Sequence, residues 1–177
     1  CHTRRQRQMC IRDRNIPGGE LYTALQTGVI DATEWVGPYN DLAFGFQQIA
    51  KYYYFPGWHE PGSMLEFIIN LDAWNELPTH LQSIVKTAAK AVNQDLLDEY
   101  TAMNNQALRE LIDVHNVQLK KLPDDVINEF RVISKSVLDE IAENDNQFKS
   151  IYESYLKFKS EVVSYHEISE DAYTKIR

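Results

Sequence analysis

Helical spacing of apolar residues dominates the second half of the chain. Beyond Leu77–Pro78, apolar residues recur every three or four positions as far as Ile112, which predicts one long helix of about forty residues or a bent pair. From Asp124 onward the same spacing predicts two further helices, interrupted at Asn144–Asn146. The stripe of the last helix is rich in aromatic residues, among them Tyr152, Tyr155, Phe158 and Tyr165. Such a stripe is typical of core or partner contact, and we expect partner contact here.

Shorter segments separated by Gly and Pro turns make up the first part of the chain. Apolar spacing predicts a helix from Glu20 that stops at Gly28, and another over Asp41–Ile49. Short apolar or aromatic runs predict strands at Val29–Ala32, Lys51–Phe55, Ser63–Asn70 and Val117–Leu122. Together these elements indicate an α/β fold over residues 15–122, followed by a helical tail over residues 123–177.

Composition and charge narrow the possible classes of protein. The chain has 177 residues, of which 44% are hydrophobic and 25% charged, as is ordinary for one globular domain or two small ones. A net charge of −8 argues against a nucleic-acid partner, which requires a basic face. No window approaches the run of about 18 apolar residues that a membrane span needs.

Residues 1–14 differ sharply from the remainder. The segment CHTRRQRQMCIRDR carries five Arg, one Asp and both cysteines, Cys1 and Cys10. It lacks the apolar core of a signal peptide, and RQRQMCIRDR resembles translated sequencing-adapter read-through. We therefore expect a non-native segment; a basic arm that binds an acidic partner is the alternative. The cysteine-free remainder fits an oxidising compartment such as the periplasm.

Two glutamates lie beside large aromatic residues in turns. Glu34–Trp35 is followed by Gly37–Pro38, and Glu60 follows Trp58 and precedes Pro61–Gly62. Gly and Pro fix turns, and rigid scaffolds present ligand-binding groups at such places. Carboxylate oxygens on aromatic-lined turns suit a hard cation or a polar small molecule. The alternative is a pair of solvated loop carboxylates.

An enzyme is the second alternative for the glutamates, because two carboxylates can act as acid and base in glycoside hydrolysis. Nothing beyond their presence supports this interpretation. The sequence shows no Ser-His-Asp or Cys-His set, no phosphate-binding Gly loop and no Cys/His metal spacing. We therefore expect a binding protein and no catalytic residues.

Three motifs within Gly18–Pro78 together resemble one family: GGELYTALQTGVIDATEW, YYYFPGWHEPG and FIINLDAWNELP. They are similar to the extracytoplasmic solute-binding proteins of tripartite ATP-independent periplasmic (TRAP) transporters. The resemblance is closest to the DctP-type branch that binds 2-oxo acids such as pyruvate, or lactate, with a metal ion. It implies a two-lobed α/β fold with a long helix spanning both lobes. Family members are considerably longer, so we expect this chain to be the C-terminal half.

The resemblance also implies the site residues. The metal ligands would be the side chains of Glu34 and Glu60 and the carbonyl of Trp35, with Na⁺ as the ion and Ca²⁺ as the alternative. The predicted substrate-binding set is Glu34, Trp35, Glu60, Tyr39, Asn40 and Trp58. Family members hold the substrate carboxylate with an arginine, and this chain has no arginine between Asn15 and Leu108. We expect that residue in the other half of the protein.

The expected function is that of a periplasmic subunit that captures a small monocarboxylate with a metal ion and delivers it to the TRAP membrane permease. Capture would proceed by closure of the lobes around the ligand. A TRAP-type binding protein for another organic acid, without an essential metal, is the alternative. The resemblance and the aromatic stripe further imply a homodimer formed through the C-terminal helices.

Overall fold

The computed structural model describes residues 14–58, 60, 62 and 65–177. The chain divides into two compact units, residues 1–121 and residues 122–177. Residues 1–13 lie outside the described part, so the prediction of a non-native N-terminal segment with Cys1 and Cys10 is not addressed by the structure.

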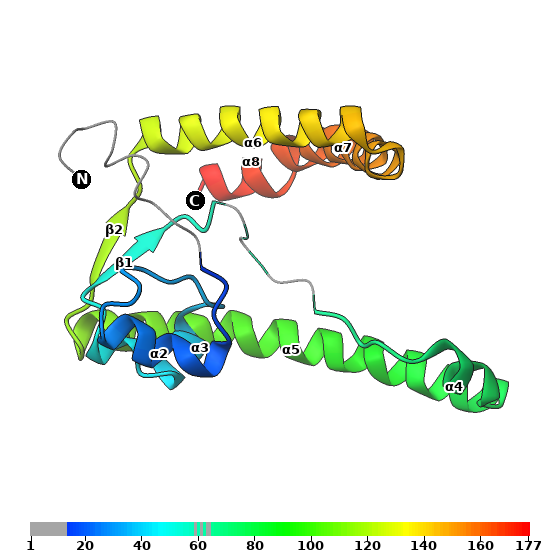
Figure 1. Cartoon of the computed structure of the whole chain (residues 1–177), viewed down its shortest axis with the longest axis horizontal. Helices are drawn as coiled ribbons and strands as arrows, with labels where there is room; N and C mark the ends of the chain where they lie inside the picture. The colour runs from blue at the N-terminus through cyan, green and yellow to red at the C-terminus, as the bar shows by residue number, and fades with distance from the viewer. Residues whose placement is uncertain (1–13, 59, 61, 63–64) are drawn as a thin grey trace. The chain divides into compact units, whose positions relative to one another are not determined.

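The first unit is built on one long helix, with most of its short elements at the C-terminal end of that helix (Figure 1). The helices among its described residues are α2 (Gly18–Gln26), α3 (Pro38–Ala43), the 3₁₀ helix η1 (Phe46–Gln48), α4 (Leu71–Glu76) and α5 (Thr79–Asp113). Its strands are β1 (Tyr52–Phe55) and β2 (Gln118–Lys121). The two strands pair in parallel, with Tyr52 opposite Gln118 and Phe55 opposite Lys121. The long connection between them contains α4 and α5, as parallel pairing requires.

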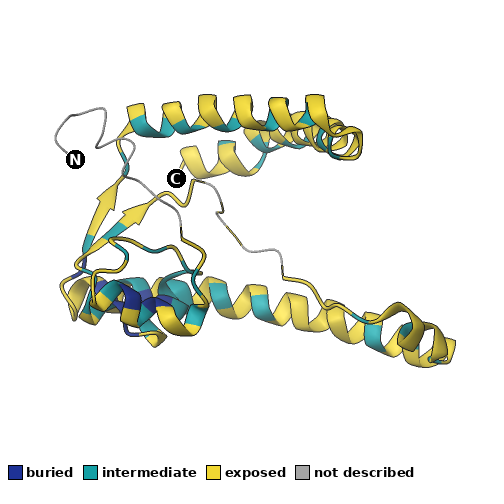
Figure 2. Cartoon of the chain, in the orientation of Figure 1, coloured by how far each residue is buried: buried dark blue, intermediate teal, exposed yellow. Residues whose placement is uncertain are grey.

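The buried apolar residues of the first unit gather at the C-terminal end of α5 (Figure 2). They are Leu21, Ala24, Phe46, Ala107, Leu111 and Val117. The N-terminal part of α5 instead leaves Ile84, Val92 and Leu97 about 60% exposed. The packed part of this unit therefore lies around α2, α3 and the last turns of α5, and it is this part that carries the predicted site.

The predicted long helix is confirmed as the single helix α5, of 35 residues. The predicted strands at Lys51–Phe55 and Val117–Leu122 are confirmed as β1 and β2. The predicted strand at Val29–Ala32 is wrong. The chain turns there instead, because Gly28 has a left-handed φ of 72° and the Val29 N–H bonds back to the Ala24 carbonyl at 2.9 Å.

Two other expectations for this unit change. Within Ser63–Asn70 the described residues 65–70 form no strand, and Phe67 and Ile68 are exposed by 74% and 82%; Ser63 and Met64 lie outside the described residues. The helix expected over Asp41–Ile49 is divided into α3 and η1, because Gly45 adopts a left-handed φ of 79°.

The second unit consists of α6 (Asp124–Asn144), α7 (Asn146–Ile168) and α8 (Glu170–Lys175). The break expected at Asn144–Asn146 is confirmed. Asp145 ends α6 and caps α7, where its carboxylate accepts the N–H groups of Gln147 and Phe148 at 2.8 and 3.0 Å. α6 packs on α7, and α7 packs on α8.

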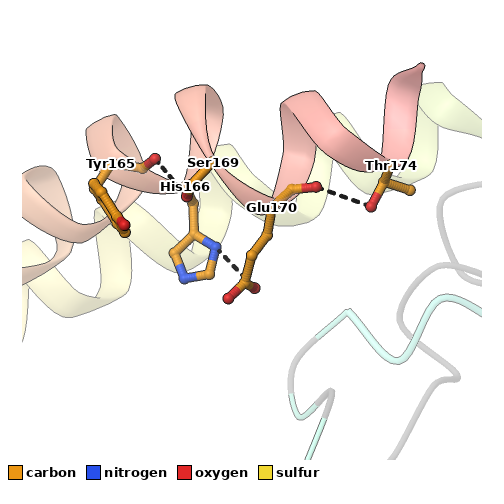
Figure 3. Close-up of polar contacts among 5 residues, drawn as sticks. All are labelled: Tyr165, His166, Ser169, Glu170 and Thr174. Carbon is orange, nitrogen blue, oxygen red and sulfur yellow. Dashed lines mark hydrogen bonds and ion pairs between the residues drawn. The ribbon is translucent and has the colours of Figure 1, made fainter. Parts of the chain in front are cut away.

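Local side-chain contacts bridge the junction between α7 and α8 (Figure 3). The Ser169 hydroxyl donates to the Tyr165 carbonyl at 2.8 Å. Within α8, the Thr174 hydroxyl donates to the Glu170 carbonyl at 2.9 Å. His166 Nδ1 lies 3.4 Å from Glu170 Oε2. Among the helices that the structure describes, none combines the length and apolar character needed to cross a membrane.

Candidate functional site

The loop between α2 and α3 carries Glu34 and Trp35. The Trp35 ring packs on Phe44, with ring centroids 4.9 Å apart. Its edge lies over Gly18 in the first turn of α2, so closely that a Cβ at Gly18 would be 2.6 Å from Trp35 Cη2. The absence of a side chain at Gly18 thus makes room for the indole. This ring fixes the backbone of the loop, including the Trp35 carbonyl, between two helices.

Polar contacts join α3 to α5 next to this loop. Asn104 Oδ1 accepts the Tyr39 N–H at 2.9 Å, and Asn40 Nδ2 donates to the Tyr100 hydroxyl at 3.2 Å. The rings of Tyr39 and Tyr100 meet edge to face at 6.0 Å. The half-buried side chains of Tyr39 and Asn40 are therefore engaged with α5 in this structure.

Asp41 is the buried charged side chain of α3, with 8% exposure. The Tyr53 hydroxyl, from β1, donates to Asp41 Oδ2 at 2.5 Å. Burial raises the pKa of Asp41 above its ordinary value, and this rise is opposed by the Tyr53 hydrogen bond and by the backbone N–H groups of Val36 and Gly37. Among the described residues, no group bonds to Asp41 Oδ1 with normal hydrogen-bond geometry. The carboxylate thus contacts both the loop and the sheet.

Tyr53 belongs to the same electrostatic cluster as Asp41. Burial raises the pKa of Tyr53, and so do its hydrogen bond to Asp41 and the negative charges of Asp41 and Glu34. Tyr53 is therefore a neutral donor at physiological pH.

The predicted site residues fall on two segments of the first unit. Glu34, Trp35, Tyr39 and Asn40 lie in the α2–α3 loop and α3, whereas Trp58 and Glu60 follow β1. Trp58 is 41% exposed, and Glu34 and Glu60 are both exposed. His59 and Pro61, on either side of Glu60, lie outside the described residues. The convergence of Glu34 and Glu60 on one ion stays a prediction.

No group of three or more His, Cys, Asp or Glu side chains suited to a metal ion occurs in the part of the chain that the structure describes. The predicted ligand set does not require such a group, because it uses two carboxylates and one main-chain carbonyl. A Ca²⁺ ion takes six to eight oxygen ligands. The remaining ligands would then come from water, from the bound acid or from another segment.

Sequence reasoning missed four residues that position this region: Asp41, Tyr53, Tyr100 and Asn104. Asp41 has the sequence context of a first-turn carboxylate that interacts with the helix dipole. Only the structure shows that Asp41 is buried and that it is bonded to β1 through Tyr53. Asn104 and Tyr100 lie on a helix predicted from its apolar residues, and nothing in the pattern of apolar residues distinguishes these two polar ones.

Comparison with known families assigns the chain to a protein family. Residues 7–145 match the DctP family, described as bacterial extracellular solute-binding protein, family 7. The chain belongs to the DctP family. The resemblance inferred from the three motifs is thereby confirmed. Because the DctP family consists of solute-binding proteins, the expectation of a binding protein rather than an enzyme is also confirmed.

Three relatives extend the comparison. The chain is 39% identical over 158 residues to the monocarboxylate 2-oxoacid-binding periplasmic protein of Nostoc sp., covering 89% of this chain and 43% of the relative. It is similar to a solved TRAP periplasmic solute-binding protein from Pseudoalteromonas atlantica with bound sodium and pyruvate, at 37% identity and a TM-score of 0.86, covering 92% of this chain and 49% of the relative.

The third relative is a TRAP transporter solute-binding protein from Bordetella bronchiseptica, at 34% identity and a TM-score of 0.85. Its structure is a mixed-occupancy dimer, with copurified calcium and picolinate in one active site and an apo second site. The alignment covers 92% of this chain and 48% of that relative. The chain thus spans about half the length of the relatives it matches. The α/β binding-protein fold expected from the sequence is confirmed.

Proposed function

We propose that this chain forms part of a periplasmic TRAP solute-binding protein that captures a small 2-oxo monocarboxylate together with a cation and delivers it to a membrane permease. The similarity to the Pseudoalteromonas protein, which holds sodium and pyruvate, carries this proposal. The Nostoc relative, described as binding monocarboxylate 2-oxo acids, supports the same ligand class. Delivery to a permease is included because a solute-binding subunit of a TRAP transporter passes its ligand to the membrane subunits.

In this proposal the cation binds to the side chains of Glu34 and Glu60 and to the carbonyl of Trp35. A cation between the glutamates would offset their mutual repulsion and attract the carboxylate of the ligand. Sodium and calcium both favour oxygen ligands of this kind, and relatives contain each of them. We assign sodium, with calcium as the alternative.

Tyr39, Asn40 and Trp58 are proposed to line the pocket for the acid. The Tyr39 backbone N–H and the Asn40 side-chain amide are both held by α5, which fixes the start of α3 beside the Glu34–Trp35 loop. Trp58 exposes an aromatic surface on the segment that leads to Glu60. A small acid would then contact the cation on one side and these uncharged groups on the other.

Calorimetry on the complete product of the gene that encodes this chain tests the proposal. Titration with tetramethylammonium pyruvate avoids adding sodium, and NaCl or CaCl₂ is then supplied separately. Glu34→Gln and Glu60→Gln should each weaken cation-dependent binding at least tenfold, an order of magnitude taken from the loss of metal-site groups. Glu66→Gln is the control, because Glu66 is an exposed glutamate outside the proposed site.

Unchanged affinity in both glutamine variants would remove the site assignment. Equal pyruvate affinity with EDTA and without sodium would favour a binding protein without an essential metal. Failure of pyruvate to bind under any of these conditions would favour a different organic acid. Titrations with lactate and picolinate under the same conditions show whether a different organic acid binds, and whether its binding depends on the cation.

A homodimer formed through the C-terminal helices is proposed on a separate observation. Tyr155, Phe158 and Tyr165 on α7 are 54%, 64% and 67% exposed, and the Bordetella relative is a dimer. Phe158→Glu should shift the mass measured by analytical ultracentrifugation from dimer to monomer, because it places a charge on the apolar stripe. Lys157→Glu is the matched control, and a monomeric parent protein would contradict the proposal.

A further inference from the structure

We propose that Asp41 and Tyr53 form a positioning pair that fixes the Glu34–Trp35 loop against β1 and thereby sets the affinity for the cation. This inference rests on the proposed function, because it concerns the same site. Neither residue belongs to the predicted ligand set. The pair would act through the loop backbone, and not by contact with the ion.

The geometry of Asp41 supports this role. Residues 29–37 contain neither helix nor strand, so contacts with neighbouring elements must fix the position of Glu34. The Asp41 carboxylate receives the Tyr53 hydroxyl at 2.5 Å and interacts with the N–H groups of Val36 and Gly37. One side chain therefore joins α3, the end of the ligand-bearing loop and a strand.

Tyr53 supplies the rigid end of this connection. It is the second residue of β1, where it pairs with Leu119 of β2. The strand continues through Phe55 towards the segment that holds Glu60. A hydrogen bond from Tyr53 to Asp41 therefore connects the two chain segments that carry the proposed cation ligands.

The burial of Asp41 argues that this carboxylate serves geometry more than stability. Burying a charged group is costly unless it is paired or well hydrogen-bonded. Here Oδ1 makes no hydrogen bond of normal geometry to any described residue. An apolar side chain at this helix position would avoid that cost, but it could not accept the Tyr53 hydroxyl or the loop N–H groups.

The test combines cation titration with amide exchange on the complete gene product. Tyr53→Phe removes only the hydroxyl, and Tyr54→Phe is the matched control because Tyr54 is an exposed neighbour on the same strand. In Tyr53→Phe the calcium Kd should rise by about tenfold, as is found for groups that orient metal ligands. In the cation-free state, peptides covering residues 31–37 should exchange their amide hydrogens faster in Tyr53→Phe than in the native protein. At saturating CaCl₂, the Kd of Tyr53→Phe for tetramethylammonium pyruvate should return to the native value.

Asp41→Ala provides a second variant, which removes the acceptor of the Tyr53 hydroxyl. If the two residues act through one shared bond, the effects of Tyr53→Phe and Asp41→Ala on calcium affinity will not add in the double variant. Additive effects would overturn the pair. So would a native calcium Kd together with native exchange in Tyr53→Phe, and so would a pyruvate Kd that saturating calcium does not restore.

These outcomes are separable from those that test the proposed function. If Glu34→Gln and Glu60→Gln weaken calcium binding but Tyr53→Phe does not, only the positioning pair fails. If the native protein binds neither sodium nor calcium, the proposed function fails and the link to cation affinity fails with it. Amide exchange in the cation-free protein would then still show whether Tyr53 holds the loop.

Discussion

The close contact between Gly18 and Trp35 can be tested by comparing alanine substitutions at two adjacent glycines, Gly18 and Gly19. Gly18→Ala would place a Cβ 2.6 Å from Trp35 Cη2 and 3.0 Å from Cζ3. Non-bonded carbon atoms are normally separated by about 3.5–4.0 Å, so the indole must move by about 1 Å. The ring cannot move freely, because it also packs on Phe44 at 4.9 Å.

The magnitude follows from two opposing effects. Overpacking of this kind costs about 1–3 kcal/mol, whereas replacing Gly by Ala in a helix gains about 0.5–1 kcal/mol. Gly19 lies in the same helical turn, and a Cβ there would meet nothing within 4 Å. Gly19→Ala should therefore be neutral or stabilising. The difference between the two variants isolates the steric cost, about 1–3 kcal/mol.

Urea unfolding followed by far-UV circular dichroism measures both free energies, and near-UV circular dichroism reports the packing of the tryptophans. Gly18→Ala should alter the near-UV signal and Gly19→Ala should not. Because the displaced ring belongs to the residue whose carbonyl is a proposed ligand, Gly18→Ala should also weaken calcium binding. Equal stability and equal spectra for the two variants would show that the indole does not rest on Gly18, and the account of loop placement would then be wrong.

Three further predictions concern single side chains. Asn104→Ala should lower the free energy of unfolding, measured in urea, by about 1–3 kcal/mol, because the part-buried Tyr39 N–H loses its acceptor. Asn105→Ala is the control, because Asn105 is exposed. An equal loss of stability in the two variants would refute the reasoning. Because the pKa of Asp41 is raised above 3.8 in the folded state, its stabilising contribution is complete below the unfolded pKa and is lost as pH rises through the folded pKa. Asp41→Asn should then gain stability relative to the native protein across that interval, and a pH-independent difference would contradict this. Asp145→Ala should destabilise the second unit by about 1 kcal/mol, seen as lost helicity at a lower urea concentration.

The helices of this protein could be predicted from sequence because their determinants are local. α5 follows from apolar spacing, and the break between α6 and α7 follows from the polar residues around Asp145, whose carboxylate caps α7. Val29–Ala32 was predicted wrongly for a related reason. A short apolar run is compatible with a strand or with a turn that covers the end of a helix, and the left-handed Gly28 selects the turn.

The site is predictable only in part, because its support is non-local. The motifs around Glu34 and Glu60 point to the family and to a candidate cation site. The bonds that hold this region join residues 12 and 65 positions apart, Tyr53 to Asp41 and Tyr39 to Asn104. Neither pair lies on a single helix or strand, so the periodicity of the sequence gives no sign that these residues are partners. The partners therefore become visible only when the elements are packed.

The small number of proposed ligands leads to a last prediction, that cation and acid bind cooperatively. Two carboxylates and one carbonyl leave a hard cation short of its usual six or more oxygen ligands, and a carboxylate of the bound acid can supply one or two of them. By thermodynamic linkage, the factor by which calcium raises the affinity for pyruvate must equal the factor by which pyruvate raises the affinity for calcium. Calorimetric titrations in both orders on the complete gene product measure the two factors. A factor of one in both directions would show that the acid binds without touching the ion, and the shared cation site would have to be abandoned.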